Sequence, residues 1–211
     1  LRLCLFRRRA VYQSQEADPL KNEKREEISF PFIIAKLPAL GVDYSKSGID
    51  TDYPLVIGIQ NGENITIAEN NIASDALLAA GSYPTLNTVM VETVKNLEIL
   101  NNNISSTDFN GEGKAGYLYV LDLYRLTDST IFGNNIVVKI PDGAAAKGSA
   151  YGMQLNGVTT NLGIYENNFT SIGNGYAYGI YVSDYYGAVE AEIADNVFDI
   201  TGYAGTGKSN L

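Results

Sequence analysis

A nine-residue pattern, repeated along the chain, constrains the possible fold more than any other feature of the sequence. Its nine positions hold, in order, a polar residue, an apolar or small residue, any residue, Ile, any two residues, Asn, either Asn or Val, and either Ile or Phe. Five copies align without a gap, and the first Asn of the pair recurs at intervals of 32, 32, 33 and 29 residues. Self-similarity at a period of this length is typical of a stacked repeat architecture.

Apolar residues alternate with polar or small ones at a period of two within each unit. Ile65 and Ile67 flank Thr66, and Leu97 and Ile99 repeat the pattern. This alternation predicts strands with one buried face. Three short strands per unit cannot close a core alone, so we expect the units to stack with parallel pairing, about 4.8 Å apart. The predicted fold is all-β: a right-handed, single-stranded parallel β-helix, a solenoid of about five to six coils.

The Asn pair of the repeat has a structural explanation in this geometry. A tight turn between two strands needs a residue that tolerates the left-handed region, as Asn does. When coils stack in register, each Asn amide can also donate to the carbonyl of the next. We therefore predict an Asn ladder made by the first Asn of each pair, namely Asn70, Asn102, Asn134, Asn167 and Asn196. The second column is less strict, since it ends at Val197.

A Tyr opens an apolar stretch in every unit. These residues are Tyr53, Tyr83, Tyr117, Tyr151 and Tyr178. Two interpretations stay open: a stacked ladder that packs at the start of each strand, or an aromatic face that stacks on sugar rings. The loops between the Asn motif and the next Tyr vary in length, as binding loops at one edge of a solenoid do, and as solvated surface loops also do.

Composition excludes several functional classes. The chain has no His and one Cys, so Ser-His or Cys-His catalysis, a His-ligated metal and a disulfide framework are excluded. The net charge of -9 argues against nucleic-acid binding. No run of about 18 apolar residues exists, so no membrane span is predicted.

One compact cluster of mixed charge stands out among the candidate catalytic residues. Asp122 and Arg125 fall on opposite faces of a strand by parity, and Asp128 occupies the polar turn position of the repeat. A glycoside hydrolase needs two or three clustered carboxylates, and no such motif is visible elsewhere. We therefore interpret the cluster as an exterior salt pair and a turn residue rather than as a catalytic site.

A second candidate site has the spacing of a calcium loop. Asp108, Asn110 and Glu112 supply oxygen ligands at alternate positions before Gly113. Tyr119 stands where the motif requires a bidentate Glu, so a plain turn competes with the calcium site. Apart from calcium, no cofactor is expected.

The repeat over residues 53–200 resembles the parallel β-helix of the pectate-lyase superfold. Its Asn-Leu-x-Ile-x-x-Asn-Asn-Phe units resemble adhesin-like surface proteins of methanogenic archaea and bacterial proteins with a right-handed β-helix region. The resemblance implies an extracellular or cell-surface location, and a non-catalytic scaffold or rod that binds carbohydrate or another cell-surface ligand. The alternative is a polysaccharide lyase, glycoside hydrolase or tailspike-like domain acting on acidic polysaccharide, because one superfold hosts many activities.

The chain divides into two parts by composition. Residues 1–27 are a polar, basic extension that we expect to be disordered or foreign to the domain. Residues 28–211 form the β-helix domain, with units that start near residues 53, 83, 117, 151 and 178. Both ends look open, so we expect a longer array, a cap or end-to-end self-association.

Overall fold

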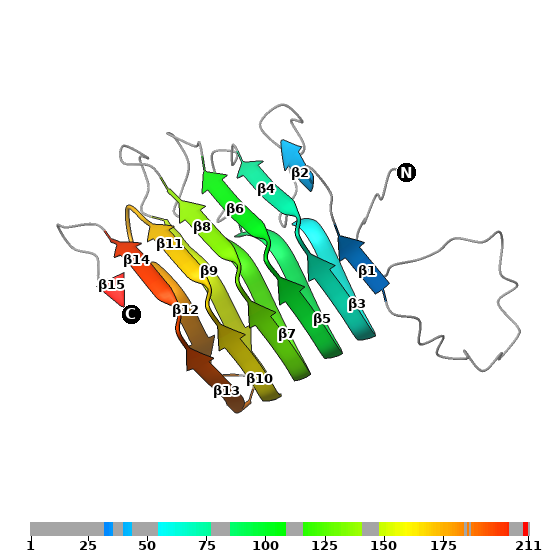
Figure 1. The fold of residues 1–211 in the computed structure, drawn as a ribbon. Coiled ribbons are helices and arrows are strands. Elements are labelled where there is room, and N and C mark those ends of the chain that lie inside the picture. The colour runs from blue at the N-terminus through cyan, green and yellow to red at the C-terminus, as the bar shows by residue number, and fades with distance from the viewer. Residues whose placement is uncertain are drawn as a thin grey trace, which may run out of the picture.

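The structure is a computed structural model, and it describes residues 32–35, 40–43, 55–76, 85–108, 116–140, 148–183, 185, 187–202 and 209–210. Within these ranges the chain forms parallel strands and no helix, stacked as a β-solenoid of about four turns (Figure 1). The predicted all-β class and parallel stacking are therefore confirmed. The predicted number of coils was higher, and the predicted extension at residues 1–27 lies outside the described residues.

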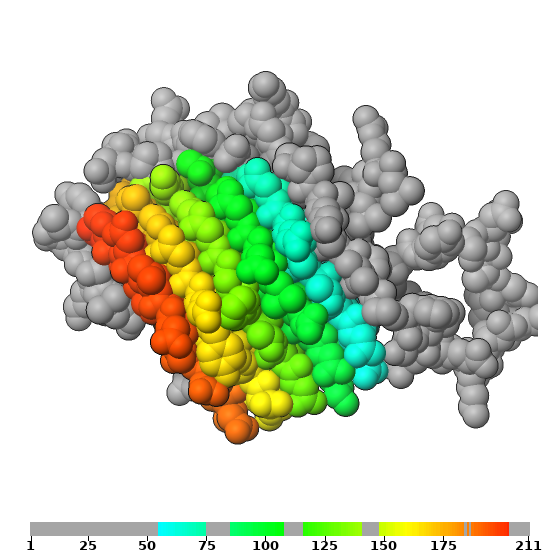
Figure 2. Space-filling model, viewed as in Figure 1, coloured from blue at the N-terminus to red at the C-terminus, as the bar shows by residue number. Residues whose placement is uncertain are grey.

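Two parallel sheets run through the stack of coils. The first contains β1 (Phe32–Ala35), β3 (Leu55–Ala68), β5 (Thr85–Leu100), β7 (Tyr117–Phe132), β9 (Ser149–Asn156), β10 (Thr159–Tyr165), β12 (Ala177–Ser183), β13 (Val189–Ala194) and β15 (Ser209–Asn210). The second contains β2 (Leu40–Asp43), β4 (Asn71–Ala76), β6 (Asn103–Asp108), β8 (Asn135–Lys139), β11 (Asn168–Ile172) and β14 (Val197–Thr201). Figure 2 shows successive coils as adjacent bands in chain order.

The long strands turn a corner of the coil and contribute to two of its faces. The first half of β7 pairs with β9, and its second half pairs with β10. Residues with positive φ recur at this corner in successive coils, at Asn64, Asn96, Asp128 and Asn161. Asn and Asp tolerate the left-handed region better than most residues. The polar residue that opens each of the first four copies of the repeat is therefore a corner residue.

Apolar side chains form columns along the interior. Ile67, Ile99, Ile131 and Ile164 are register partners and are fully buried. Ile193 continues the column on β13, where it is 46% exposed. The alternation read from the sequence thus places one face of each strand in the core, and the last coil leaves its share of that core partly open.

The size of the side chains in the interior columns differs from coil to coil, and a larger residue in one column faces a smaller one in another. The second sheet contributes Ile104 and Ile136, and then Phe169 at the next coil, all fully buried. Phe169 fits because Gly152 faces it: a Cβ at Gly152 would lie 2.9 Å from Cδ1 of Phe169 and 2.7 Å from the carbonyl oxygen of Gly179. The larger ring is therefore accommodated by a missing side chain on β9.

Candidate functional site

The first Asn of each pair forms a continuous hydrogen-bonded column inside the solenoid. Each Nδ2 donates to the Oδ1 of the Asn one coil further on, at 3.0, 3.0, 2.9 and 3.0 Å from Asn70 through to Asn196. The backbone N–H of the same Asn donates to that Oδ1 at 2.9 Å in every case. From Asn102 onward, Nδ2 also donates to an Ile carbonyl of the previous coil. These are the hydrogen bonds of the predicted ladder.

The reason given for Asn at this turn was wrong in one respect. The residues with positive φ stand one position earlier, at Glu69, Asn101, Gly133, Glu166 and Asp195. The left-handed position therefore accepts several residue types. The column keeps Asn because a side-chain amide can accept two hydrogen bonds and donate two at the same buried point.

The second Asn column forms a surface ladder of opposite polarity. Asn103 donates to Asn71 at 3.0 Å, Asn135 donates to Asn103 at 2.8 Å, and Asn168 donates to Asn135 at 3.3 Å. Donation here runs toward the N-terminal coil, whereas the buried ladder donates toward the C-terminal coil. These Asn side chains are exposed, so water can replace the bonds and the column can end at Val197.

The tyrosines form a stacked ladder, but its members differ from the predicted column. Tyr119, Tyr151 and Tyr178 are register partners, with ring centroids 4.6 and 4.7 Å apart. Tyr117 belongs to the neighbouring column, opposite Ser149, and its ring centroid lies 6.4 Å from that of Tyr119. The sequence placed Tyr117 in the ladder because it opens the apolar stretch, and it is corrected to Tyr119. The predicted members Tyr53 and Tyr83 lie outside the described residues.

The stacking decides which ring can take a ligand. Both faces of Tyr151 are covered by neighbouring rings, and its side chain is only 8% exposed. Tyr119 stacks on Tyr151 on one side, whereas its register partner on the other side is Asn87, which carries no ring. Tyr151, inside the ladder, is therefore a packing residue. Tyr119 is the last ring of the ladder, and the next residue in the same column is the smaller Asn87.

A pocket of about 300 Å³ opens where the Tyr ladder ends. Its lining comes from four successive coils and consists of Leu55, Thr85, Asn87, Met90, Tyr119, Asp122, Tyr124 and Gln154. Asp122 pairs in register with Met90 and Gln154, three residues along β7 from Tyr119. The pocket thus combines an aromatic wall with a carboxyl and two amides on the outward side of the first sheet.

Asp122 is the group of this pocket whose pKa is moved toward neutral pH. Burial raises the pKa of its carboxyl to about 7, an effect that hydrogen bonding with Tyr124, and then with Asn156, partly offsets. Oδ1 of Asp122 is buried and has no hydrogen-bond partner, and the same holds for Oδ1 of Asn87. Asn156 acts at longer range, because its own amide atoms have no partner within hydrogen-bond distance. Near neutral pH the Asp122 carboxyl therefore exists in both protonation states.

The same environment acts on the rings. Burial, reinforced by Tyr151 and Asp122, raises the pKa of Tyr119 above its usual range. Burial also raises the pKa of Tyr151 to about 12. Both phenols therefore stay protonated and can donate a hydrogen bond at any physiological pH.

The charged cluster read from the sequence is split by the fold. Asp122, expected in an exterior salt pair, is buried in the pocket with 3% exposure. Arg125 instead pairs with Glu92 at 2.9 Å, and Gln60 donates to the other oxygen of Glu92 at 2.8 Å. Asp128 lies at the corner as a turn residue and accepts a hydrogen bond from Asn161 at 2.9 Å. The expectation was wrong for Asp122 because all four residues from Val120 to Leu123 are buried, so burial here does not follow the alternation of the strand.

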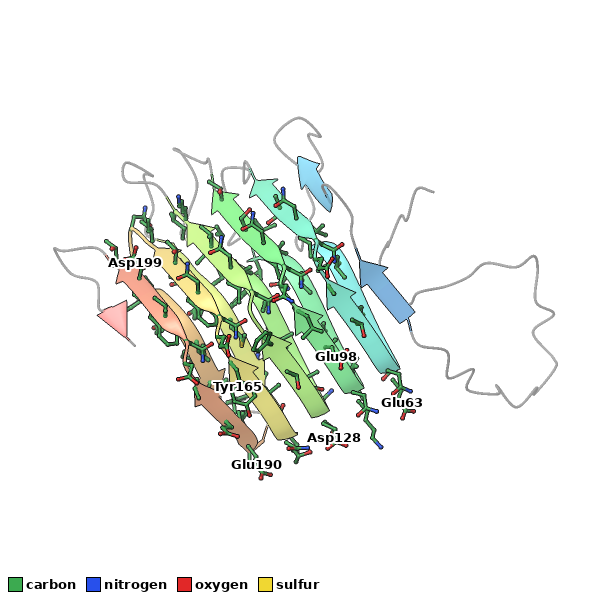
Figure 3. The ribbon with its side chains drawn as sticks, in the orientation of Figure 1. Glu63, Glu98, Asp128, Tyr165, Glu190 and Asp199 are labelled. Atoms are coloured by element: carbon green, nitrogen blue, oxygen red, sulfur yellow. The ribbon has the colours of Figure 1, made fainter. Side chains whose placement is uncertain are left out.

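Another face of the molecule, away from the pocket, carries acidic and hydroxyl side chains. Figure 3 shows Glu63, Asp128 and Glu190 along one edge of it, with Glu98 and Tyr165 above them. Tyr165 donates to Glu192 at 2.8 Å on this surface. These side chains form a solvated acidic face, which agrees with the net charge of -9.

The remaining sequence-based expectations fall largely outside the described residues. Asp108 ends β6, but Asn110 and Glu112 of the calcium loop are not described. Among the residues that are described, no group of three or more His, Cys, Asp or Glu is placed to hold a metal ion. The described part of the chain also has no helix long and apolar enough to cross a membrane.

Register was the signal that could have located the pocket. Tyr119 lies 32 residues before Tyr151 and 32 after Asn87, the same spacing as the first Asn repeats. A search for Asn and Tyr at that interval would have joined these positions into one column. Comparisons of the chain with protein-family models, with curated proteins and with solved structures gave no match.

Proposed function

We propose that this chain is a non-catalytic β-solenoid rod of the extracellular or cell-surface kind, and that it binds carbohydrate in the pocket beside Tyr119. The observation that carries the proposal is the pairing of an aromatic ring with buried acceptor atoms that have no protein partner. Tyr119 offers the ring, and Asp122 and Asn87 offer the acceptors. A sugar presents an apolar C–H face and several hydroxyl donors, which complements this combination.

The rest of the molecule suits a rigid support. The buried ladder joins successive coils from Asn70 to Asn196 with side-chain hydrogen bonds. A solenoid of this kind presents its outward columns at regular spacing and displays a site without rearrangement. The acidic surface favours solubility of the rod.

A glycan array with the full chain tests the proposal. We expect binding to a subset of glycans, and Tyr119→Ala should weaken it at least tenfold, since one aromatic contact contributes about 1.4 kcal/mol or more. Tyr165→Ala removes a tyrosine from the other face and should leave the affinity unchanged. Absence of binding to any glycan, or equal loss in both variants, would contradict the proposal.

A second function is favoured by the raised pKa of Asp122. A carboxyl that is still partly protonated near neutral pH is what a general acid in glycoside hydrolysis needs. Such an enzyme also needs a second, free carboxylate, and both oxygens of Glu92 are already bonded to Arg125 and Gln60. Release of shortened glycans by the wild type, and not by Asp122→Asn, would establish the enzyme instead of the binding rod.

A further inference from the structure

The polar groups of the pocket favour one kind of sugar over others. Two of the residues that line the pocket have a buried oxygen without a partner: Oδ1 of Asn87 is an acceptor, and Oδ1 of Asp122 is an acceptor when the carboxyl is ionised. Neither Lys nor Arg is among the residues that line the pocket, and Arg125 nearby is engaged with Glu92. With Asp122 ionised, the site therefore requires donors from its ligand, and a sugar carboxylate would meet a like charge without a cation to balance it.

The aromatic rings of the lining favour a positively charged hydrogen-bond donor. Tyr119 and Tyr124 border the same pocket as Asp122, together with Met90 and Leu55. An ammonium group is stabilised both by a carboxylate and by the face of an aromatic ring. A hydroxyl gains less from either partner, because it carries no charge.

We infer that the pocket takes an amino sugar, with the pyranose ring against Tyr119 and the protonated amino group against Oδ1 of Asp122. Asn87 accepts a hydrogen bond from a neighbouring hydroxyl. This inference rests on the proposed carbohydrate binding and names its ligand class. It replaces the acidic polysaccharide suggested by the resemblance to polysaccharide lyases with a cationic one.

Binding of this ligand displaces a proton from Asp122. Burial raises the pKa of the Asp122 carboxyl to about 7, so at pH 6 about 0.9 of the molecules carry the proton. An ammonium ligand favours the ionised form, and the proton is released. The described titratable groups around the pocket include Tyr119 and Tyr124 of β7 and Glu92 of β5 with its partner Arg125. The tyrosines in contact with Tyr119 or Tyr151 complete the set, namely Tyr117, Tyr151, Tyr178 and Tyr181. Burial raises the pKa of Tyr119 and of Tyr151, so these phenols keep their protons and Asp122 is the source of the released proton.

Calorimetry at pH 6 tests the inference on the full chain. The probes are a glucosamine oligomer, the N-acetylglucosamine, glucose and glucuronate oligomers of the same length, and trilysine. We expect the glucosamine oligomer to bind at least tenfold more tightly than any other probe. In buffers of different ionisation enthalpy, its binding should release nearly one proton per site. Asp122→Asn should reduce its affinity to that of the N-acetylglucosamine oligomer, whereas Tyr165→Ala should not change it.

The failures of the two proposals can be told apart. If a neutral, N-acetylated or acidic oligomer binds as tightly as glucosamine, the amino-sugar inference is wrong and carbohydrate binding stands. Equal binding of trilysine shows recognition of charge alone and also overturns the inference. If no oligomer binds at any pH, both proposals are wrong. The proton release is measured on the wild type, so the test does not depend on the folding of a variant.

Discussion

At the scale of single residues, Asn134 shows how a side chain joins neighbouring coils. Its Oδ1 accepts from the backbone and the side chain of Asn102, and its Nδ2 donates to Ile99, Phe132 and Asn167. Asn134→Ala leaves several buried groups without partners, so we expect the free energy of unfolding to fall by roughly 4 kcal/mol. Urea denaturation followed by circular dichroism measures this change.

Asn135 is the matched control, because it is the same residue type at the next position. Its ladder is exposed, and water replaces the hydrogen bonds that Asn135→Ala removes. We expect a loss below about 1 kcal/mol. Similar losses in both variants would mean that burial of the inner ladder is not what makes it strong.

Asp122 makes the stability of the chain depend on pH. Its folded pKa of about 7 lies above the ordinary value of 3.8, so the folded state holds the proton more tightly than the unfolded state between these values. Stability therefore falls as pH rises from about 4 to 7, by on the order of 4 kcal/mol for this group. Asp122→Asn should abolish this part of the pH dependence and be more stable than the wild type at pH 8. Denaturation midpoints across this pH range check it, and parallel curves for the two proteins would contradict it.

How far the sequence predicts single residues depends on what each one needs. The ladder of Asn70 to Asn196 could be predicted, because an amide column has a strict residue type and a strict interval. The pocket could not, since Asp122 is buried within a run of four buried residues, Val120 to Leu123, that alternation does not predict. The positive-φ column could not either, because Glu, Asn, Gly and Asp all occupy it.

At the scale of strands, β9 and β11 are coupled because the small Gly152 on β9 leaves room for the large Phe169 on β11. Gly152→Ala would bring a Cβ within 3.0 Å of both Phe169 and the backbone of Gly179, so we expect a loss of about 1–3 kcal/mol. The preceding coil has Val120 and Ile136 at the equivalent places of these strands. Combining Gly152→Ala with Phe169→Ile should therefore recover part of the loss, and a double-mutant cycle measures the coupling. Additive losses would show that Phe169 is not what limits the volume at Gly152.

At the scale of the whole molecule, each coil contacts only its neighbours, so stability should decrease toward the less covered coil. β5 and β7 lie within the stack and carry fully buried columns, whereas Ile193, Val197 and Phe198 on β13 and β14 are 46%, 63% and 36% exposed. We expect amide protons of β13 and β14 to exchange well before those of β5 and β7. Hydrogen exchange on the 211-residue chain measures this order, and uniform protection would contradict it.

The parallel stacking was predictable at this scale because the repeat interval forces each column into register. The site was less predictable, because it arises where one column changes from Asn87 to Tyr119. A repeat shows what the coils share, whereas a pocket forms where they differ. The pocket of this solenoid lies at such a break in a column.

The central claim is that the pocket beside Tyr119 binds carbohydrate and leaves it intact. Calorimetric titration of an array-selected glycan into the wild type, Tyr119→Ala and Tyr165→Ala, with mass analysis of the recovered glycan, tests it most directly. We predict an affinity at least tenfold lower for Tyr119→Ala, an unchanged affinity for Tyr165→Ala, and glycan of unchanged mass. Equal affinities for the two variants, or a shortened glycan, would contradict the claim.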